Sequence, residues 1–349
     1  MTYVVSTHSF LIVIEFDRDW GISNHHVLNR GYHFGIALVE NGSDRSAVPA
    51  DFIVYRGGDS VYEQDDRRLS RYRHEDGSYS VVDSRPLVGK FGDVHQLARA
   101  NGGIYIVNSK YNSLVFEDLE HDRRHEYRFE RGDRDRVHAN SVYACGDEVF
   151  VLLHNRGRRE SELVMLRHDA DRGFEYARTL SLWNLGCHNV FIDGDRFFYN
   201  ASFSREFVVV DLTNDRVVER IPFGQWHTKG MSVTQDYLVV GLSERTHRDN
   251  RSTSKAKLAV IDRHALSVVR MIDLDLPSLP HAIGNINDIR CLSGGELAHA
   301  HPTKTEADWS RLRFARRDRL FHFKYRAPAK LLLPLRRLKG FIYRGFQRA

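Results

Sequence analysis

Histidines that open short apolar segments are the residues of this sequence best suited to chemistry. Five of them each begin a pattern of strand, polar turn and strand: His26, His95, His138, His188 and His227. A sixth copy, NDIRCLSGGELAHAH, begins with Asn287. Neutral imidazole binds Zn, Fe, Cu and Ni, and a bound ion can activate water or polarise an oxygen. If the repeats converge, the four histidines after His26 are candidate ligands of a divalent metal ion such as Zn or Fe.

A structural role for the same histidines is the alternative. A histidine at a recurring strand start also serves to hydrogen-bond one repeat to the next. A ring of repeats does not fix ligand geometry as the two histidines of an HExxH helix do. Both interpretations stay open, and in the structural one only one or two of the histidines face a ligand.

Polar residues that close the strand after each opener are predicted to share its face. In an antiparallel pair the start of one strand lies beside the end of the next, so one face collects the closing residues as candidate ligand-binding groups. They include Asn108, Ser109, His154, Asn155, Asn200, Ser202, Glu244 and Arg245. Alternation along the strand adds Asn140 and Lys229, two residues after His138 and His227. Asn287, the sixth opener, completes the set.

Positive charge near this face predicts an anionic ligand. Lysine is almost never fully buried without a partner, so Lys229 within an inner strand is expected to face the channel and to meet an anionic group. The stretch SERTHRDNRSTSKAK, residues 243–257, adds Arg245 and further arginines, whose forked guanidinium groups suit phosphate or carboxylate. A solvated charged loop is the alternative for this stretch.

Signatures of several enzyme classes are absent from the sequence. It has no GxSxG elbow, no P-loop and no dinucleotide-binding glycine fingerprint, so serine-elbow acyl transfer, P-loop phosphoryl transfer and NAD-dependent hydride transfer lack support. No pair of glycosidase carboxylates can be picked out. Asp93 and Asp135 shortly precede His95 and His138, and either acid can orient its histidine or form a turn.

Short strands must position these residues. Segments rich in β-branched and aromatic residues, bounded by Gly, Asn, Asp or Ser, fill residues 1–300, among them FLIVIEF, GIYIVN, EVFVLLH and EFVVVDL. From His95 onwards the openings recur at roughly 40 to 60 residues, a spacing that suits four-stranded propeller blades. The sequence predicts an all-β fold, a six-bladed β-propeller, with five or seven blades as alternatives.

The two ends of the propeller are predicted to complete one blade together. The segment YVVSTHSFLIVIEFD resembles the middle of a later repeat, and NINDIRCL supplies its missing innermost strand. Such pairing closes the ring and removes exposed strand edges. The long gap between His26 and His95 is assigned to an insertion, RGGDSVYEQDDRRLSRYRHEDGSYSVVDS, expected to form an elaborated outer strand or a surface loop. The propeller is expected over residues 1–305.

Composition favours a large core in a reducing compartment. The 349 residues are 42% hydrophobic and 11% aromatic, enough to bury a large core. Three cysteines without a CxxC pair fit neither a disulfide framework nor a thiolate zinc site. The first residues have the pattern of strands rather than of a signal peptide, and no run of about 18 apolar residues occurs. We therefore expect a cytoplasmic location.

The net charge of +5 conceals a basic tail. Thirteen of the 51 basic residues and one of the 46 acidic residues lie in 311–349, which leaves 38 basic and 45 acidic residues in the remainder. A mildly acidic body argues against specific nucleic-acid binding through a broad basic face. In the tail, residues 306–349, cations alternate with Leu, Phe and Tyr, which predicts a segment lying on an anionic membrane surface. An RNA-binding arm and a segment docked on the acidic body are the alternatives.

Several phrases of the sequence resemble an uncharacterised bacterial β-propeller family. They are YVVSTHSFLIVIEFD, DVHQLARANGGIYIVNSKYNSLVFED, DRVHANSVYACGD, HTKGMSVTQDYLVVGLSER and INDIRCLSGG, within about residues 1–295. The resemblance implies motif positions for His95, His138 and Asn140. His227 and Lys229 depart from the pattern, and Lys229 stands where the family has an arginine. The family has no agreed activity, although its members tend to be associated with surface polysaccharides.

Three functions are compatible with the sequence. The first is a propeller at the cytoplasmic membrane surface that binds or processes a polar, anionic saccharide or lipid-linked sugar in cell-surface polysaccharide biosynthesis. The second is a metal-dependent hydrolase or lyase that uses the channel histidines. The third is a non-catalytic scaffold, because propellers host catalysis and scaffolding alike.

Overall fold

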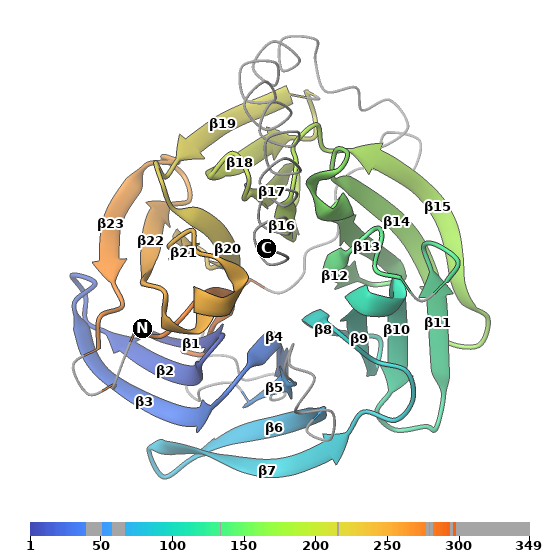
Figure 1. The fold of residues 1–349 in the computed structure, drawn as a ribbon, viewed down its shortest axis with the longest axis horizontal. Helices are drawn as coiled ribbons and strands as arrows, with labels where there is room; N and C mark the ends of the chain where they lie inside the picture. Colours follow the sequence, from blue (N-terminus) through green and yellow to red (C-terminus); the bar gives the residue numbers. More distant parts are fainter. Residues whose placement is uncertain are drawn as a thin grey trace, which may run out of the picture.

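The chain folds as a six-bladed β-propeller in the computed structural model (Figure 1). The structure describes residues 1–39, 51–57, 67–132, 134–214, 216–276, 279, 282–293 and 296–297. Six four-stranded antiparallel sheets stand around a central axis, which confirms the predicted fold class. The tail, residues 306–349, lies outside the described residues.

Blade 1 contains strands from both ends of the described chain, as predicted. From the axis outwards it comprises β24 (Ile286–Cys291), β1 (Thr2–Thr7), β2 (Phe10–Phe16) and β3 (Ile22–Arg30). Tyr3 pairs with Cys291 and Val5 with Ile289, so the ring closes through backbone hydrogen bonds between distant segments. This closure removes the exposed edge that an open ring would leave.

The other blades each use four consecutive strands. Blade 2 comprises β4 (His33–Val39), β5 (Asp51–Arg56), β6 (Arg68–Glu75) and β7 (Ser78–Pro86). Blade 3 comprises β8 (Val94–Ala100), β9 (Gly103–Asn108), β10 (Ser113–Asp118) and β11 (Arg124–Arg128). Blade 4 comprises β12 (Ala139–Cys145), β13 (Glu148–Leu153), β14 (Glu162–Asp169) and β15 (Gly173–Ser181).

The last two blades complete the ring. Blade 5 comprises β16 (Cys187–Asp193), β17 (Arg196–Ala201), β18 (Glu206–Asp211) and β19 (Arg216–Pro222). Blade 6 comprises β20 (His227–Val233), β21 (Tyr237–Ser243), β22 (Ala256–Asp262) and β23 (Val268–Asp273). Short 3-10 helices follow three second strands, namely η1 (Ser109–Tyr111), η2 (Asn155–Gly157) and η3 (Arg248–Thr253).

The predicted start of blade 2 is wrong. His26 lies on β3, the outermost strand of blade 1, where its ring is exposed and its Nε2 lies 2.9 Å from the Asn24 amide nitrogen. The innermost strand of blade 2 is β4, which begins at His33. The segment assigned to an insertion contributes β6 and β7, ordinary third and fourth strands of this blade.

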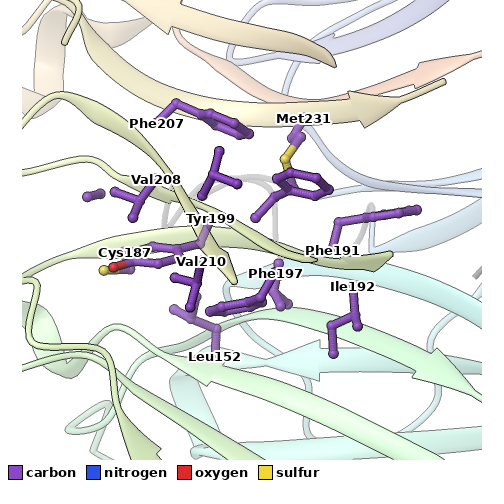
Figure 2. Packing of buried hydrophobic residues seen from close by; sticks show 14 of the residues in the cluster. Leu152, Cys187, Phe191, Ile192, Phe197, Tyr199, Phe207, Val208, Val210 and Met231 are labelled. Atoms are coloured by element: carbon purple, nitrogen blue, oxygen red, sulfur yellow. The ribbon is translucent and has the colours of Figure 1, made fainter. Parts of the chain in front are cut away.

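Blades pack against each other through apolar side chains on both faces of their sheets. Figure 2 shows Phe197 and Tyr199 of β17 beside Val208 and Val210 of β18, with Leu152 of β13 from the neighbouring blade. Each such buried side chain contributes about 1.5–3 kcal/mol relative to exposure. The resulting core holds the inner strands in place and so fixes what their ends present.

Polar side chains also join each inner strand to the next. The side-chain amide oxygen of Gln96 accepts from the Val142 backbone N–H at 2.9 Å. The side-chain amide oxygen of Asn189 accepts from the Gly230 backbone N–H at 2.8 Å. Ser141 Oγ accepts likewise from blade 5, and the Asp288 carboxylate accepts from blade 2. These clasps satisfy backbone groups beside strand irregularities that would otherwise stay unpaired.

Candidate functional site

One side chain per blade lines the mouth of the channel where the inner strands begin. We call this set the mouth ring: Phe34, His95, Asn140, His188, Lys229 and Asn287. Each stands next to a break in the register between its strand and the second strand of the blade. Two of its members, His95 and His188, are predicted metal ligands, and the other four are Phe34, Asn140, Lys229 and Asn287.

Three further histidines extend the ring outwards, and we call them the mouth rim. His138 directly precedes β12, His227 begins β20, and His154 directly follows β13. The rings form a continuous series of contacts, with centroids 4.6 Å apart for His95–His138, 5.2 Å for His138–His154, 4.9 Å for His154–His188 and 5.7 Å for His188–His227. The structure therefore brings the four predicted metal-ligand histidines to one mouth.

His154 belongs to this series although it was not among the predicted metal ligands. Its position at the end of a strand placed it on the correct face in the sequence. Its side chain is buried, and its Nδ1 has no hydrogen-bond partner among the described residues. A buried polar atom of this kind is paired in most proteins, so the position favours a ligand contact.

Hydrogen bonds fix the protonation of His95 and His188. Nδ1 of His95 lies 2.9 Å from the Asp93 carbonyl oxygen, and Nδ1 of His188 lies 3.2 Å from the Gly186 carbonyl oxygen. A carbonyl only accepts, so Nδ1 carries the proton and donates it. In the neutral ring Nε2 then keeps its lone pair and can accept a hydrogen bond from a ligand.

Two serines stand behind these imidazoles. Ser109 Oγ lies 3.2 Å from Nδ1 of His95, and Ser202 Oγ lies 2.7 Å from Nδ1 of His188. Each hydroxyl also donates to a backbone carbonyl of the next blade, that of Ala139 or Thr228. Their protons are committed to the fold, so these serines support the histidines rather than act as nucleophiles.

His138 is held differently, by a carboxylate. Its Nδ1 lies 2.7 Å from Asp135 Oδ2, and Arg156 of η2 pairs with the same oxygen. Arg156 Nε also donates to the Asp135 backbone carbonyl at 3.1 Å. Asp135 therefore orients its histidine through its side chain. Asp93, the other acid considered, orients His95 through its backbone carbonyl.

The imidazoles of the mouth are neutral at neutral pH. Burial first, and then positive neighbours, hold the pKa values of His95, His154 and His188 well below the usual value. Burial also lowers the pKa of His138, although Asp135 opposes the shift, and it lowers that of His227 to about 3. Lys229 is among the charges that lower all five pKa values, so its ammonium lies within electrostatic reach of every mouth histidine.

Lys229 connects the imidazoles with the aromatic side of the mouth. Its Nζ donates to the Asn287 side-chain oxygen at 2.9 Å and lies 5.1 Å from the centroid of the Phe34 ring. Phe34 stacks on Tyr32 at 6.5 Å and contacts His95 at 5.3 Å. One side of the mouth thus offers aromatic faces and the other offers imidazole lone pairs, with a cation between them.

The predicted asparagines serve mainly to join backbone segments. Asn140 donates to the Cys187 carbonyl, and Asn287 donates to the His33 carbonyl, in each case across to the next blade. Asn108, Asn155 and Asn200 are buried and donate to the carbonyls of Lys90, Glu160 and Gly230. The buried amides therefore hold the mouth in shape, and Asn287 also accepts a hydrogen bond from Lys229.

Glu244 and Arg245 are exposed residues that directly follow β21, at the end of the blade where the mouth lies. The Glu244 N–H donates to the Lys255 carbonyl, which ties the start of the polar stretch to its end. Arg245 and Arg251 are among the positive charges that lower the pKa of His227. The polar stretch therefore contributes positive potential to the mouth.

A metal centre is not preformed in the described part of the chain. There, no three His, Cys, Asp or Glu side chains are grouped so that they could hold a metal ion. The mouth histidines follow one another edge to face around the opening, which spreads their nitrogens instead of converging them. The predicted metal ion stays a prediction.

Alternation along the strand does not explain the mouth ring. The alternation that predicted Asn140 and Lys229 for this face would equally place Leu97 and Val190 there, two residues after His95 and His188. Leu97 and Val190 are buried in the core, whereas Asn140 and Lys229 occupy the same place as His95 and His188. His138 and His227 thus stand earlier in their blades than His95 and His188 do in theirs.

A six-bladed propeller with a histidine-rich, cationic mouth is the class that fold and site define. No protein-family model matches the sequence, and no curated protein is similar to it in sequence. Solved structures match the fold. One is a nidogen/laminin complex, with 10% identity and a TM-score of 0.55 over 84% of this chain and 99% of that chain.

Two other similar structures come from bacteria. A protein of unknown function from Bacteroides caccae is 13% identical, with a TM-score of 0.56 over 83% of this chain and 97% of its own. A protein from Lactobacillus plantarum is 10% identical, with a TM-score of 0.53 over 83% and 99%. At these identities the likeness shows the fold alone. Within the described ranges no helix is long and apolar enough to cross a membrane.

Proposed function

We propose that the mouth binds an anionic saccharide. The observation that carries the proposal is a lysine ammonium within electrostatic reach of five imidazoles that stay neutral. A saccharide with a carboxylate or phosphate complements this set, because its hydroxyls donate to Nε2 lone pairs while its anion meets Lys229. Phe34 and Tyr32 supply apolar faces for the carbon skeleton of a sugar ring.

The proposal extends to the membrane surface through the sequence. The basic tail, residues 311–349, combines cations with leucines and aromatic residues, a composition that favours anionic lipid surfaces. A cytoplasmic saccharide-binding propeller held there would meet lipid-linked sugars of cell-surface polysaccharide biosynthesis. The family resemblance supports the same setting.

Calorimetric titration tests the binding proposal. The ligands are glucuronate, galacturonate and glucose 1-phosphate, with glucose as the neutral comparison. We expect the acids to bind and Lys229→Met to weaken them about tenfold, the worth of one charge-assisted hydrogen bond. Lys229→Arg keeps the charge and should retain most of the affinity.

Arg172→Ala is the matched control for this titration. Arg172 is an exposed cation in the turn between β14 and β15, at the end of the blade away from the mouth, so its removal should leave binding unchanged. Equal affinity of the wild type and Lys229→Met would contradict the proposal, as would a failure of every acid to bind. In the second case metal content, measured before and after His95→Ala and His138→Ala, separates a metal enzyme from a scaffold.

A further inference from the structure

Blade 4 departs from the repeat at its entry to the mouth. Blades 3 and 5 enter through Asp93 and Gly186, both with positive φ, and place a histidine two residues later. In blade 4 the residue with positive φ is His138 itself, at 48°, and the later place holds Asn140. This conformation costs an L-residue about 1–2 kcal/mol, which glycine avoids. The backbone conformation alone would favour glycine at this position, so we attribute the histidine to the place in which it puts its imidazole.

The hydrogen-bond partners of His138 orient its ring in the way that suits a general base. Asp135 Oδ2 lies 2.7 Å from Nδ1 of His138 and accepts the hydrogen bond that keeps the proton on Nδ1. Nε2 is therefore the basic nitrogen of the ring. The Asp135 side chain is 8% exposed and is also paired with Arg156, so it keeps this orientation. The His138 side chain is 14% exposed, which leaves part of its ring accessible at the mouth. His95 and His188 have backbone carbonyls behind Nδ1 and lack such a carboxylate.

The other groups at the mouth narrow the chemistry that this base can perform. The hydroxyls of Ser109 and Ser202 donate to backbone carbonyls, so neither of these serines is an activated nucleophile. Asp135 is engaged by His138 and Arg156, so its carboxylate is not available as the acid of a glycoside hydrolase. A base beside a cation suits removal of a proton next to a carboxylate, because the cation stabilises the charge that develops on the carboxylate.

Resting on the proposed saccharide binding, we propose that the mouth cleaves a 4-linked uronate by β-elimination, with His138 as the catalytic base and Asp135 as its positioning residue. Nε2 of His138 takes the proton from C5, next to the carboxylate. The electron pair of that C–H bond becomes the C4=C5 double bond, and the C4–O4 bond breaks. The leaving oxygen receives the proton back from the His138 imidazolium, so atoms and charge balance without water or a further reactant.

The charges around His138 agree with this assignment. Burial lowers the pKa of His138 while the Asp135 carboxylate opposes the shift, so the imidazole is neutral and able to accept a proton at neutral pH. Arg156 and Lys229 are the positive groups acting on it, and His95 and His154 are its imidazole neighbours. Lys229 is the cation assigned to the substrate carboxylate.

The test follows the ultraviolet absorbance of the unsaturated product. Full-length protein is incubated with oligosaccharides of 4-linked galacturonate, mannuronate and glucuronate, and binding of the same oligosaccharides is measured by titration. His138→Asn is the variant of choice because asparagine tolerates the left-handed conformation. We expect it to bind substrate and to lose at least about 100-fold in kcat, the lower range for general-base catalysis. Arg172→Ala is the control and should retain full activity.

Asp135→Asn separates positioning from structure. It keeps a side chain of the same shape but removes the charge that raises the pKa of His138, so the rise of kcat with pH should shift to lower pH as kcat falls. Wild-type protein that binds a uronate but forms no unsaturated product would overturn the elimination and leave the binding proposal standing. Protein that binds none of the oligosaccharides overturns the elimination, and it overturns the proposed function as well when glucuronate, galacturonate and glucose 1-phosphate also fail to bind. Unchanged kcat in a folded His138→Asn variant overturns the role of His138.

Discussion

Mild acid is expected to destabilise the propeller because many of its histidines are buried in the neutral form. Burial lowers the pKa values of His33 and His168 to about 4 and that of His227 to about 3. An unfolded histidine binds a proton below about pH 6.5, so the unfolded state gains protons first and stability falls as the pH drops through that value. Between about pH 7 and pH 5 each group removes about 2 kcal/mol from the unfolding free energy.

One buried acid works in the opposite direction. Burial raises the pKa of Glu296 to about 7, so the folded state binds this proton first and stability rises by about 2 kcal/mol between about pH 7 and pH 5. The three histidines remove about 6 kcal/mol together, which leaves a net loss of about 4 kcal/mol. His95, His154 and His188 add to the loss because their pKa values are lowered in the same direction. The sum is a large part of the total stability of a typical domain.

Urea unfolding at a series of pH values between 7.5 and about 5 measures this slope. His33→Gln replaces a buried imidazole with a side chain that does not titrate, so its unfolding free energy should fall by about 2 kcal/mol less over the interval. His26→Gln, at an exposed position on β3, is the matched control and should keep the wild-type slope. An unfolding free energy that stays constant between pH 7 and 5 would refute the reasoning.

Three further predictions test the fold and the tail. Gly35→Ala places a Cβ 2.7 Å from the Leu97 backbone nitrogen at φ +53°, whereas Gly77→Ala has no neighbour within 4 Å at φ +78°; thermal unfolding should show the first variant less stable by about 1–3 kcal/mol. Ser202→Ala removes a buried hydroxyl that joins blade 5 to blade 6, and urea unfolding should show a loss of about 1–3 kcal/mol. Full-length protein should sediment with anionic liposomes more strongly than a chain ending at Thr305, and equal sedimentation would contradict the membrane role of the tail.

The second and third strands of the blades were predictable because burial on both faces gives them continuous apolar runs. FLIVIEF, GIYIVN and EFVVVDL became β2, β9 and β18 without correction. The outer strands had no comparable signal, since β3 and β23 are mostly exposed and polar or mixed in sequence. Backbone pairing to the preceding strand holds them in the sheet, and that pairing does not depend on the side-chain pattern.

The candidate site was predictable to the level of one face of the ring. Antiparallel pairing placed His154 and the other strand ends beside the histidine openers, and the structure brings them together. Which residues occupy equivalent places in different blades was not predictable. A register shift near the start of each of these inner strands breaks the regular alternation of side chains on which the prediction was based. Phe34 was not predictable in this way because it is apolar, whereas the repeated pattern is defined by polar residues at the strand starts.

The mouth is free to specialise because other residues hold the blades together. Gln96, Ser141, Asn189 and Asp288 clasp neighbouring inner strands from the next place along the chain. Two members of the mouth ring, the asparagines, share this task by donating to carbonyls of the next blade, and Lys229 of blade 6 reaches Asn287 of blade 1. A ring needed only for closure would repeat one side chain at equivalent places. Six places that hold four kinds of side chain, with a cation among neutral imidazoles, instead form an asymmetric surface, and an asymmetric surface can orient a ligand.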